Sequence, residues 1–196
     1  MLSVNTESYD SEQAFPVAGD VPLKTGGFCL NGRGSWDGLA SGYKKAADIL
    51  ADHIEVSING GDLVIHPIAL LYRHHLELSL KHLIRKGNAL LESPVGLRNT
   101  HSLAELWEDC AEVLENLDIY IEGDDLKPFQ ACIDCFENLD SRGEAFRYPE
   151  RSTGTSALPA NFDSVDLGNL RRVVDRMSFF LEICGDMISE KTSEWW

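Results

Sequence analysis

The sequence predicts an all-α protein, a bundle of about five helices preceded by an irregular N-terminal arm. Five segments repeat apolar residues at intervals of three and four, and the segments between them are rich in Gly, Pro, Asn and Asp. No segment gives a clear strand pattern. The chain has 196 residues and 43% hydrophobic content, enough to bury one sizeable core. We therefore expect an arm, residues 1–35, and one bundle, residues 36–196.

The first helix is predicted from Trp36 to about Ile54, after an arm with many Gly, Ser, Asp and Asn residues and no sustained period. Its apolar positions recur every three or four residues. The sequence Asn59-Gly60-Gly61 then ends the helix. The β-branched residues that flank these three are compatible with a short hairpin or with a simple loop.

The second helix is predicted from Pro67 to about Lys86, because proline suits the first turn of a helix, where its missing N–H has no intrahelical partner. Two apolar rows cover most of its circumference, and His75 and His82 lie within one of them. The remaining stripe consists of residues four apart, Arg73, Glu77, Lys81 and Arg85. Since buried charges must be paired, we expect Arg73 and Glu77 to form a polar network inside the bundle.

Three further helices follow a loop predicted from Gly87 to Thr100. The pattern Ser-Leu-Ala-Glu at residues 102–105 is a capping box and starts the third helix. The fourth is predicted at about residues 125–139 and the fifth at about residues 165–189. The fifth carries an apolar seam that can pack inside the bundle or against a partner chain, formed by Leu170, Val174, Met177 and Leu181.

The net charge of −15 argues against broad, nonspecific binding of nucleic acid, which usually needs a basic patch or stripe. The charge is uneven, because arginines gather in the C-terminal third, so a local anion site is compatible with the sequence. No apolar run approaches the ~20 residues that a membrane span needs. The first residues lack the features of a signal peptide. We expect a cytoplasmic protein that does not enter a membrane.

The five cysteines are scattered and odd in number, which favours reduced thiols in the core. Cys132 and Cys135 have the spacing of a redox or zinc motif, but they lack a second pair and share the apolar row of Phe129 and Phe136, so core packing is favoured. The histidines of the second helix lack the spacing typical of metal ligands. No motif for nucleotides or hydrolytic catalysis occurs, and we expect neither a metal nor a cofactor.

The segment Glu-Ala-Phe-Arg-Tyr-Pro-Glu-Arg-Ser, residues 144–152, allows two interpretations. Pro149 disfavours the helical conformation at Tyr148, so the segment can simply end a helix and leave Arg147 as a surface cation. Alternatively, the planar guanidinium of Arg147 anchors a phosphate or pairs with Glu77 at the centre of the bundle.

Three motifs in order, residues 72–87 (YRHHLELSLKHLIRKG), residues 100–107 (THSLAELW) and residues 146–149 (FRYP), resemble the HEPN superfamily. The resemblance covers about residues 67–149. It implies a helical bundle, commonly a dimer, in a superfamily where many members are metal-independent ribonucleases of prokaryotic defence and toxin–antitoxin systems. The catalytic signature of those enzymes is an arginine followed by a histidine four to six residues later, and no arginine of this chain has one.

The resemblance implies candidate catalytic residues Glu77 and Arg147, and a histidine from elsewhere would have to complete the site: His74, His75 or His101. Arg73, Lys81 and Tyr148 are candidate binding residues. Two functions are compatible with these residues. The first is a non-catalytic or weakly catalytic interaction or regulatory module, a homodimer with a possible protein partner encoded nearby. The second is an endoribonuclease with a rearranged Arg/His site, which would make RNA its substrate.

Overall fold

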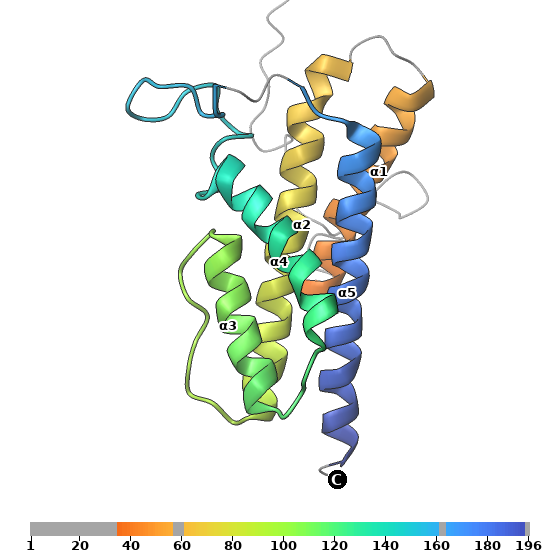
Figure 1. The fold of residues 1–196 in the computed structure, drawn as a ribbon, viewed down its shortest axis with the longest axis vertical. Coiled ribbons are helices and arrows are strands. Elements are labelled where there is room, and N and C mark those ends of the chain that lie inside the picture. Colours follow the sequence, from red (N-terminus) through yellow and green to blue (C-terminus); the bar gives the residue numbers. More distant parts are fainter. Residues whose placement is uncertain (1–34, 57–60, 161–163, 195–196) are drawn as a thin grey trace, which may run out of the picture. The chain divides into compact units, whose positions relative to one another are not determined.

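The computed structural model describes residues 35–56, 61–160 and 164–194, and these belong to one compact unit. Five helices run in the order α1 (Trp36–Val56), α2 (Gly61–Leu90), α3 (Leu103–Asn116), α4 (Gly123–Asp140) and α5 (Leu167–Glu194) (Figure 1). The described residues contain no sheet, and one isolated antiparallel bridge joins Glu150 to Ser156. The prediction of an all-α fold with about five helices is confirmed. Residues 1–34 of the predicted arm, Cys29 among them, and residues 57–60 lie outside the described residues. Because residues 61–65 are part of α2, the alternative of a short hairpin there is wrong.

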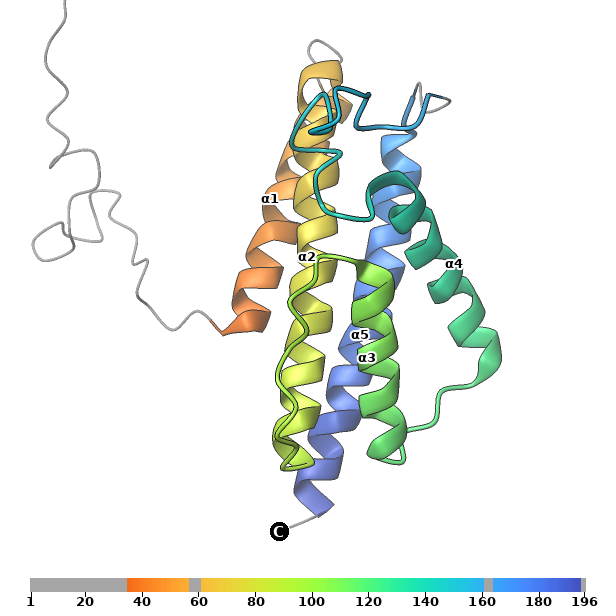
Figure 2. The same cartoon turned by 90° about the vertical axis from the view of Figure 1, so that its left-hand side faces the viewer.

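Helix α2 is the centre of the bundle, because it packs against α1, α3 and α5, as Figures 1 and 2 show. Helix α4 contacts α3 and α5. The apolar rows predicted for α2 supply much of the core. Three aromatic rings connect α3, α4 and α5. The ring centroid of Trp107 in α3 lies 4.6 Å from that of Phe129 in α4, and the Phe129 ring stacks on Phe180 of α5 with centroids 4.4 Å apart.

Both predicted ends of α2 are wrong, because the helix begins at Gly61 and continues to Leu90. Pro67 is exposed inside the helix, where it removes one backbone hydrogen bond, and the packing of the apolar rows on either side outweighs that loss. Gly87 is buried within the last turns. A Cβ atom there would overlap Cγ1 of Val113, so this glycine allows α2 and α3 to approach closely and does not start a loop.

The start of α3 confirms the predicted cap, since Oγ of Ser102 accepts a hydrogen bond from the backbone N–H of Glu105 at 3.1 Å. The amide of Ser102 donates to Oγ1 of Thr100 at 3.1 Å. The carboxylate of Glu137, from α4, accepts from the amides of Leu103 and Ala104 at 3.1 and 3.4 Å. A side chain distant in sequence therefore completes the cap and ties α4 to the first turn of α3.

The apolar seam of α5 belongs to the core of the bundle. Val174, Met177 and Leu181 are buried, and Leu170 packs against the core from its edge. This face therefore packs inside the bundle, and the alternative of a partner chain on the same seam is wrong. A second row of α5, offset around the helix, includes Phe179 and Ile183, which are 65% and 39% exposed.

The cysteines of the described residues are all free thiols, and they divide between the core and the surface. Cys110 and Cys184 are buried as predicted, and burial raises the pKa of the Cys184 thiol to about 12. Cys132 is half-buried against the core. Cys135 is exposed, so its assignment to the core is wrong: Phe129, Ile133 and Phe136 define the buried face of α4, and Cys135 lies outside it.

None of the helices in the described ranges combines the length and the apolar character that crossing a membrane requires.

Candidate functional site

The carboxylate of Glu77 is the centre of a buried polar cluster on α2. The residue is only 1% exposed. Its Oε1 accepts hydrogen bonds from Nζ of Lys81 at 2.7 Å and from Nδ1 of His101 at 2.9 Å. Its Oε2 lies 3.4 Å from Nη1 of Arg73. We call these four residues the Glu77 cluster, and they confirm that the polar stripe of α2 forms a network inside the bundle.

Arg73 is the structural cation of the Glu77 cluster, and it is 1% exposed. Its Nε donates to the backbone carbonyl of Asp140 at 3.1 Å and lies 3.4 Å from Oδ2 of the same residue. Its Nη2 donates to the carbonyl of His101 at 2.6 Å. The guanidinium therefore connects α2 with the entry to α3 and with the end of α4, as buried arginines with several donors can.

The turn after α4 is shaped to leave room for Arg73. The Oδ1 atom of Asp140 accepts hydrogen bonds from the amides of Glu144 and Ala145 at 2.7 and 3.0 Å. Gly143 has a φ of +72°, which favours glycine, and a Cβ atom there would lie 3.0 Å from Nη1 of Arg73. A single turn thus combines a positive φ with close contact to a buried cation.

The surroundings of Glu77 keep its carboxylate ionised. Burial by itself raises the pKa of Glu77, but hydrogen bonds and charge from His74, Lys81 and His101 lower it by more, and the net pKa lies well below its ordinary value. The contact with His74 is electrostatic, because its Nδ1 lies 3.9 Å from Oε2, beyond hydrogen-bond distance. This anion therefore balances the cations that the bundle encloses.

His101 is the member of the Glu77 cluster that faces solvent, with 54% of its side chain exposed. Because Nδ1 is bound to Glu77, the imidazole has a fixed orientation and Nε2 is the nitrogen left to act outside the cluster. His74 is less accessible. Its ring lies edge-on to Tyr43 at 4.4 Å, and its buried Nδ1 has no hydrogen-bond partner. Of the candidate histidines, His101 has the geometry of an oriented base.

The structure does not bring Arg147 or Tyr148 into the Glu77 cluster, so the predicted pairing of Arg147 with Glu77 is wrong. Both side chains are exposed, Tyr148 by 59%. The amides of Arg147 and Tyr148 both donate to the carbonyl of Glu144, so the segment forms a turn beyond α4. Asp140 and its carbonyl already occupy the side of Arg73 that faces this turn.

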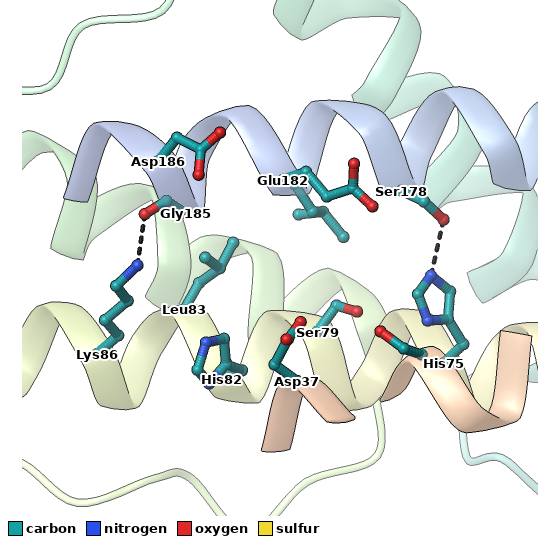
Figure 3. A pocket seen from close by; sticks show the side chains of 12 residues that line it. Asp37, His75, Ser79, His82, Leu83, Lys86, Ser178, Glu182, Gly185 and Asp186 are labelled. Carbon is teal, nitrogen blue, oxygen red and sulfur yellow. Dashed lines mark hydrogen bonds between the residues drawn. The ribbon is translucent and has the colours of Figure 1, made fainter. Parts of the chain in front are cut away.

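A second polar region lies on another face of α2, in a cavity of about 470 Å³ between α1, α2 and α5. Figure 3 shows two hydrogen bonds that join α2 to α5 across it: Nε2 of His75 to Oγ of Ser178 at 2.7 Å, and Nζ of Lys86 to the carbonyl of Gly185 at 2.6 Å. Between them, side chains from all three helices point toward the space; those used below are Asp37, Ser79, His82, Glu182 and Asp186.

His75, which the sequence places in an apolar row of the second helix, is a core histidine with a hydrogen-bond partner at each ring nitrogen. It is buried, and its Nδ1 lies 3.0 Å from the carbonyl of Ala40. Since that oxygen can only accept, Nδ1 carries the proton, and the neutral Nε2 lies 2.7 Å from Oγ of Ser178, whose single proton is accepted either by Nε2 or by the carbonyl of Val174 at 2.8 Å. Burial lowers the pKa of His75, which favours this neutral form. His82, also lining the cavity, has its pKa lowered by the same cause.

The cavity in Figure 3 contains carboxylates without cation partners. No ion pair or hydrogen bond within the described residues engages the side chains of Asp37, Glu182 or Asp186. No group of three or more His, Cys, Asp or Glu residues in the described ranges has an arrangement that could hold a metal ion. The region is therefore polar and open, whereas the Glu77 cluster is polar and paired.

The sequence did not predict two residues that complete the polar contacts of these regions, Asp140 beside Arg73 and Ser178 beside His75. Asp140 ends α4 and Ser178 interrupts an otherwise apolar stretch of α5, and these are weak signals without knowledge of the packing.

No protein-family model, curated protein or solved structure matches this chain. The HEPN resemblance therefore rests on the sequence motifs quoted above.

Proposed function

We propose that this chain is a HEPN-like helical protein that acts as an interaction or regulatory module in the cytoplasm of a prokaryote, in a defence or toxin-like context. The observation that carries the proposal is the position and hydrogen bonding of two arginines, Arg73 and Arg147. Arg73, the arginine of the Glu77 cluster, is held on several sides by protein oxygens, and Arg147 is exposed on the turn beyond α4. Neither of these two arginines is therefore free to stabilise a phosphorane beside His101 in the part of the chain that the structure describes.

An apolar groove of about 620 Å³ between α4 and α5 supports a role in binding protein. Exposed apolar side chains line it, among them Tyr120, Phe179 and Ile183. Glu122 and Arg176 also line it, so one groove carries both signs of charge. A two-fold interface needs such self-complementarity, because each copy presents the same surface. We therefore propose that the chain forms a homodimer through this groove; a protein encoded nearby is the other candidate partner.

Light scattering tests the homodimer. The native chain should have twice the monomer mass, and Ile183→Glu should shift it to the monomer, because the charge would be buried without a partner. Ile49→Glu is the matched control: Ile49 is an exposed isoleucine of α1, outside the groove. A monomer at every accessible concentration would contradict the homodimer, and co-purification with the product of a neighbouring gene would then favour the other partner.

Incubation with RNA tests the absence of strong catalysis. Purified protein should leave single-stranded and structured RNA intact, with or without divalent metal, and its negative charge should make RNA affinity weak at physiological salt. Cleavage that persists in a chelator and is abolished by Arg147→Ala would overturn the proposal.

One observation favours a metal-independent ribonuclease as a second candidate: His101 is exposed and oriented by a buried carboxylate. In that enzyme Nε2 of His101 removes the proton of the ribose 2′-hydroxyl, the 2′-oxygen attacks phosphorus, and the 5′-oxygen leaves and takes a proton from water, so one product carries a cyclic phosphate and the other a 5′-hydroxyl. Arg147 would stabilise the developing charge after a rearrangement of its turn.

The second candidate has its own test. Cleavage should fall at least ~10²-fold in His101→Ala, as loss of a general base predicts. His53→Ala, an exposed histidine of α1, is the matched control and should retain activity. Equal loss in both variants, or no loss in either, would exclude His101 as the base.

A further inference from the structure

Helix α5 presents two rows of residues at alternating intervals of three and four. The first is the seam buried in the core, and the second lines the groove between α4 and α5. We call the second the groove row, and it consists of Val173, Arg176, Phe180, Ile183 and Met187. This spacing places all five on one side of the helix, where side chains can interlock with those of another helix. The groove row covers about four turns of α5.

The groove row is only partly covered within one chain. Phe180 stacks on Phe129 of α4, but Ile183 and the neighbouring Phe179 remain exposed. Exposed apolar side chains that gather along one groove are typical of protein contact sites. A helix from outside the chain would remove these side chains from water.

Opposite charges lie at the two ends of the groove. At one end Arg176 lies near Cys132 of α4: burial raises the pKa of this thiol, and the charge of Arg176 opposes the rise. Glu122 precedes the first residue of α4, ten residues before Cys132, which corresponds to about 15 Å along a helix. Since α4 runs in roughly the opposite direction to α5, its start lies toward the C-terminal half of α5 (Figures 1 and 2). Glu122 therefore marks the other end of the groove.

Both charges at the ends of the groove are exposed and have no partner in the part of the chain that the structure describes. Glu122 is the N-cap residue of α4, yet its carboxylate makes no capping hydrogen bond. No described residue forms an ion pair with Glu122 or with Arg176. A two-fold axis across the middle of the groove exchanges its two ends, so each charge of one copy would meet the opposite charge of the other.

We propose that two copies of the chain pack groove to groove about a two-fold axis near Phe180, so that Glu122 of each copy pairs with Arg176 of the partner subunit. The inference rests on the homodimer proposed above and specifies how the two copies face each other. The two groove rows run antiparallel across the axis. The exposed ring of Phe179, near the middle of the row, is covered by the partner subunit, and the two ion pairs lie at the ends of the interface.

Charge reversal tests this arrangement, with the dissociation constant of the dimer measured by analytical ultracentrifugation. Glu122→Arg and Arg176→Glu should each raise that constant about tenfold or more, because two like-charge contacts replace two ion pairs. The double variant, which carries both substitutions, should return to within about threefold of the native constant, because each pair is restored with its signs exchanged.

An equimolar mixture of the two single variants separates pairing between copies from pairing within one copy. The Glu122→Arg chain carries arginine at both positions, and the Arg176→Glu chain carries glutamate at both. Only a mixed dimer therefore brings opposite charges together at both contacts. The mixture should form mixed dimers with a dissociation constant within about threefold of the native one. Pairing within one copy would not give this rescue.

Arg142→Glu is the matched control, because it makes the same change of charge at an exposed arginine outside the groove. Its dissociation constant should change by less than about threefold, and far-UV circular dichroism should show native helix content in every variant. A native dimer that Ile183→Glu dissociates but that neither charge reversal weakens would overturn the arrangement and leave the homodimer standing. Failure of the mixture to recover would do the same, whereas a native monomer would overturn both.

Discussion

The two polar regions on α2 contain similar side chains and differ in how these are paired. Because an α-helix turns by about 100° per residue, Arg73, Glu77 and Lys81 lie on one face, and Ser79 and His82 lie roughly opposite. On the first face each charge has partners at hydrogen-bond or ion-pair distance. On the second face, in the cavity of Figure 3, the carboxylates of Asp37, Glu182 and Asp186 have none among the described residues.

The difference reflects burial. Arg73 and Glu77 are buried where α2, the entry to α3 and the end of α4 meet, so water cannot replace a missing partner of either. The cavity is open enough for its carboxylates to remain hydrated. Paired polar groups in the interior therefore stabilise the contacts between helices, whereas the hydrated carboxylates of the cavity contribute little to stability. Four experiments test this difference.

Glu77→Ala should give the largest effect. Removing the carboxylate leaves Arg73 buried without its ion pair, which should lower the free energy of unfolding by about 3–5 kcal/mol. Urea unfolding measures the change. Glu182→Ala, on the cavity face, is the control and should alter stability by no more than about 0.5 kcal/mol. Similar losses in both variants would remove the proposed distinction between the two faces.

The free energy of unfolding should depend on pH through one group in each region, His75 in the cavity and Glu77 in the Glu77 cluster. Burial lowers the pKa of His75 from its ordinary value of 6.5, so on acidification this imidazole takes up a proton more readily in the unfolded chain than in the folded protein. The free energy of unfolding therefore falls as the pH drops below about 6.5. Glu77 also has a lowered pKa, from 4.5, so its contribution is lost only as the pH falls below about 4.5.

Two variants separate these pH ranges when thermal unfolding is followed. His75→Gln should flatten the upper range, although His82 retains part of it, and Glu77→Gln should flatten the lower one. A profile unchanged by Glu77→Gln would mean that other carboxylates determine the acid sensitivity.

Ser178→Ala should destabilise the fold by about 1–3 kcal/mol, because Nε2 of the buried His75 loses the hydroxyl that lies 2.7 Å from it. Chemical denaturation measures it. Ser79→Ala is the matched control in the same cavity, since the Ser79 hydroxyl has no hydrogen bond to a described side chain. A loss as large in Ser79→Ala would show that the serines act through packing.

The smallest difference concerns two glycines with similar backbone conformation, Gly143 and Gly154. Alanine at either position adopts an unfavourable positive φ, at a cost of roughly 1–2 kcal/mol. Only at position 143 does the new Cβ also crowd Arg73. Gly143→Ala should therefore be less stable than Gly154→Ala in thermal unfolding, and equal stabilities would mean that Arg73 moves aside freely.

The sequence by itself determined the helices and the pairing along α2, because both depend on residues three or four apart. Apolar periodicity located all five helices within a few residues at most ends, and the spacing of Arg73, Glu77 and Lys81 predicted their network. The Ser102 cap was readable for the same reason: its partner is three residues away.

Only the tertiary structure decided which distant groups meet. Asp140 lies 67 residues from Arg73, and Ser178 lies 103 residues from His75. No local pattern encodes such pairs, and for the same reason the sequence allowed Arg147 as a partner of Glu77, whereas the structure leaves Arg147 exposed on the turn beyond α4. Local rules failed at Pro67 and Gly87 for a related reason. The contacts of α2 with its neighbours stabilise a helix longer than either residue would favour alone, and the close approach to Val113 requires the glycine.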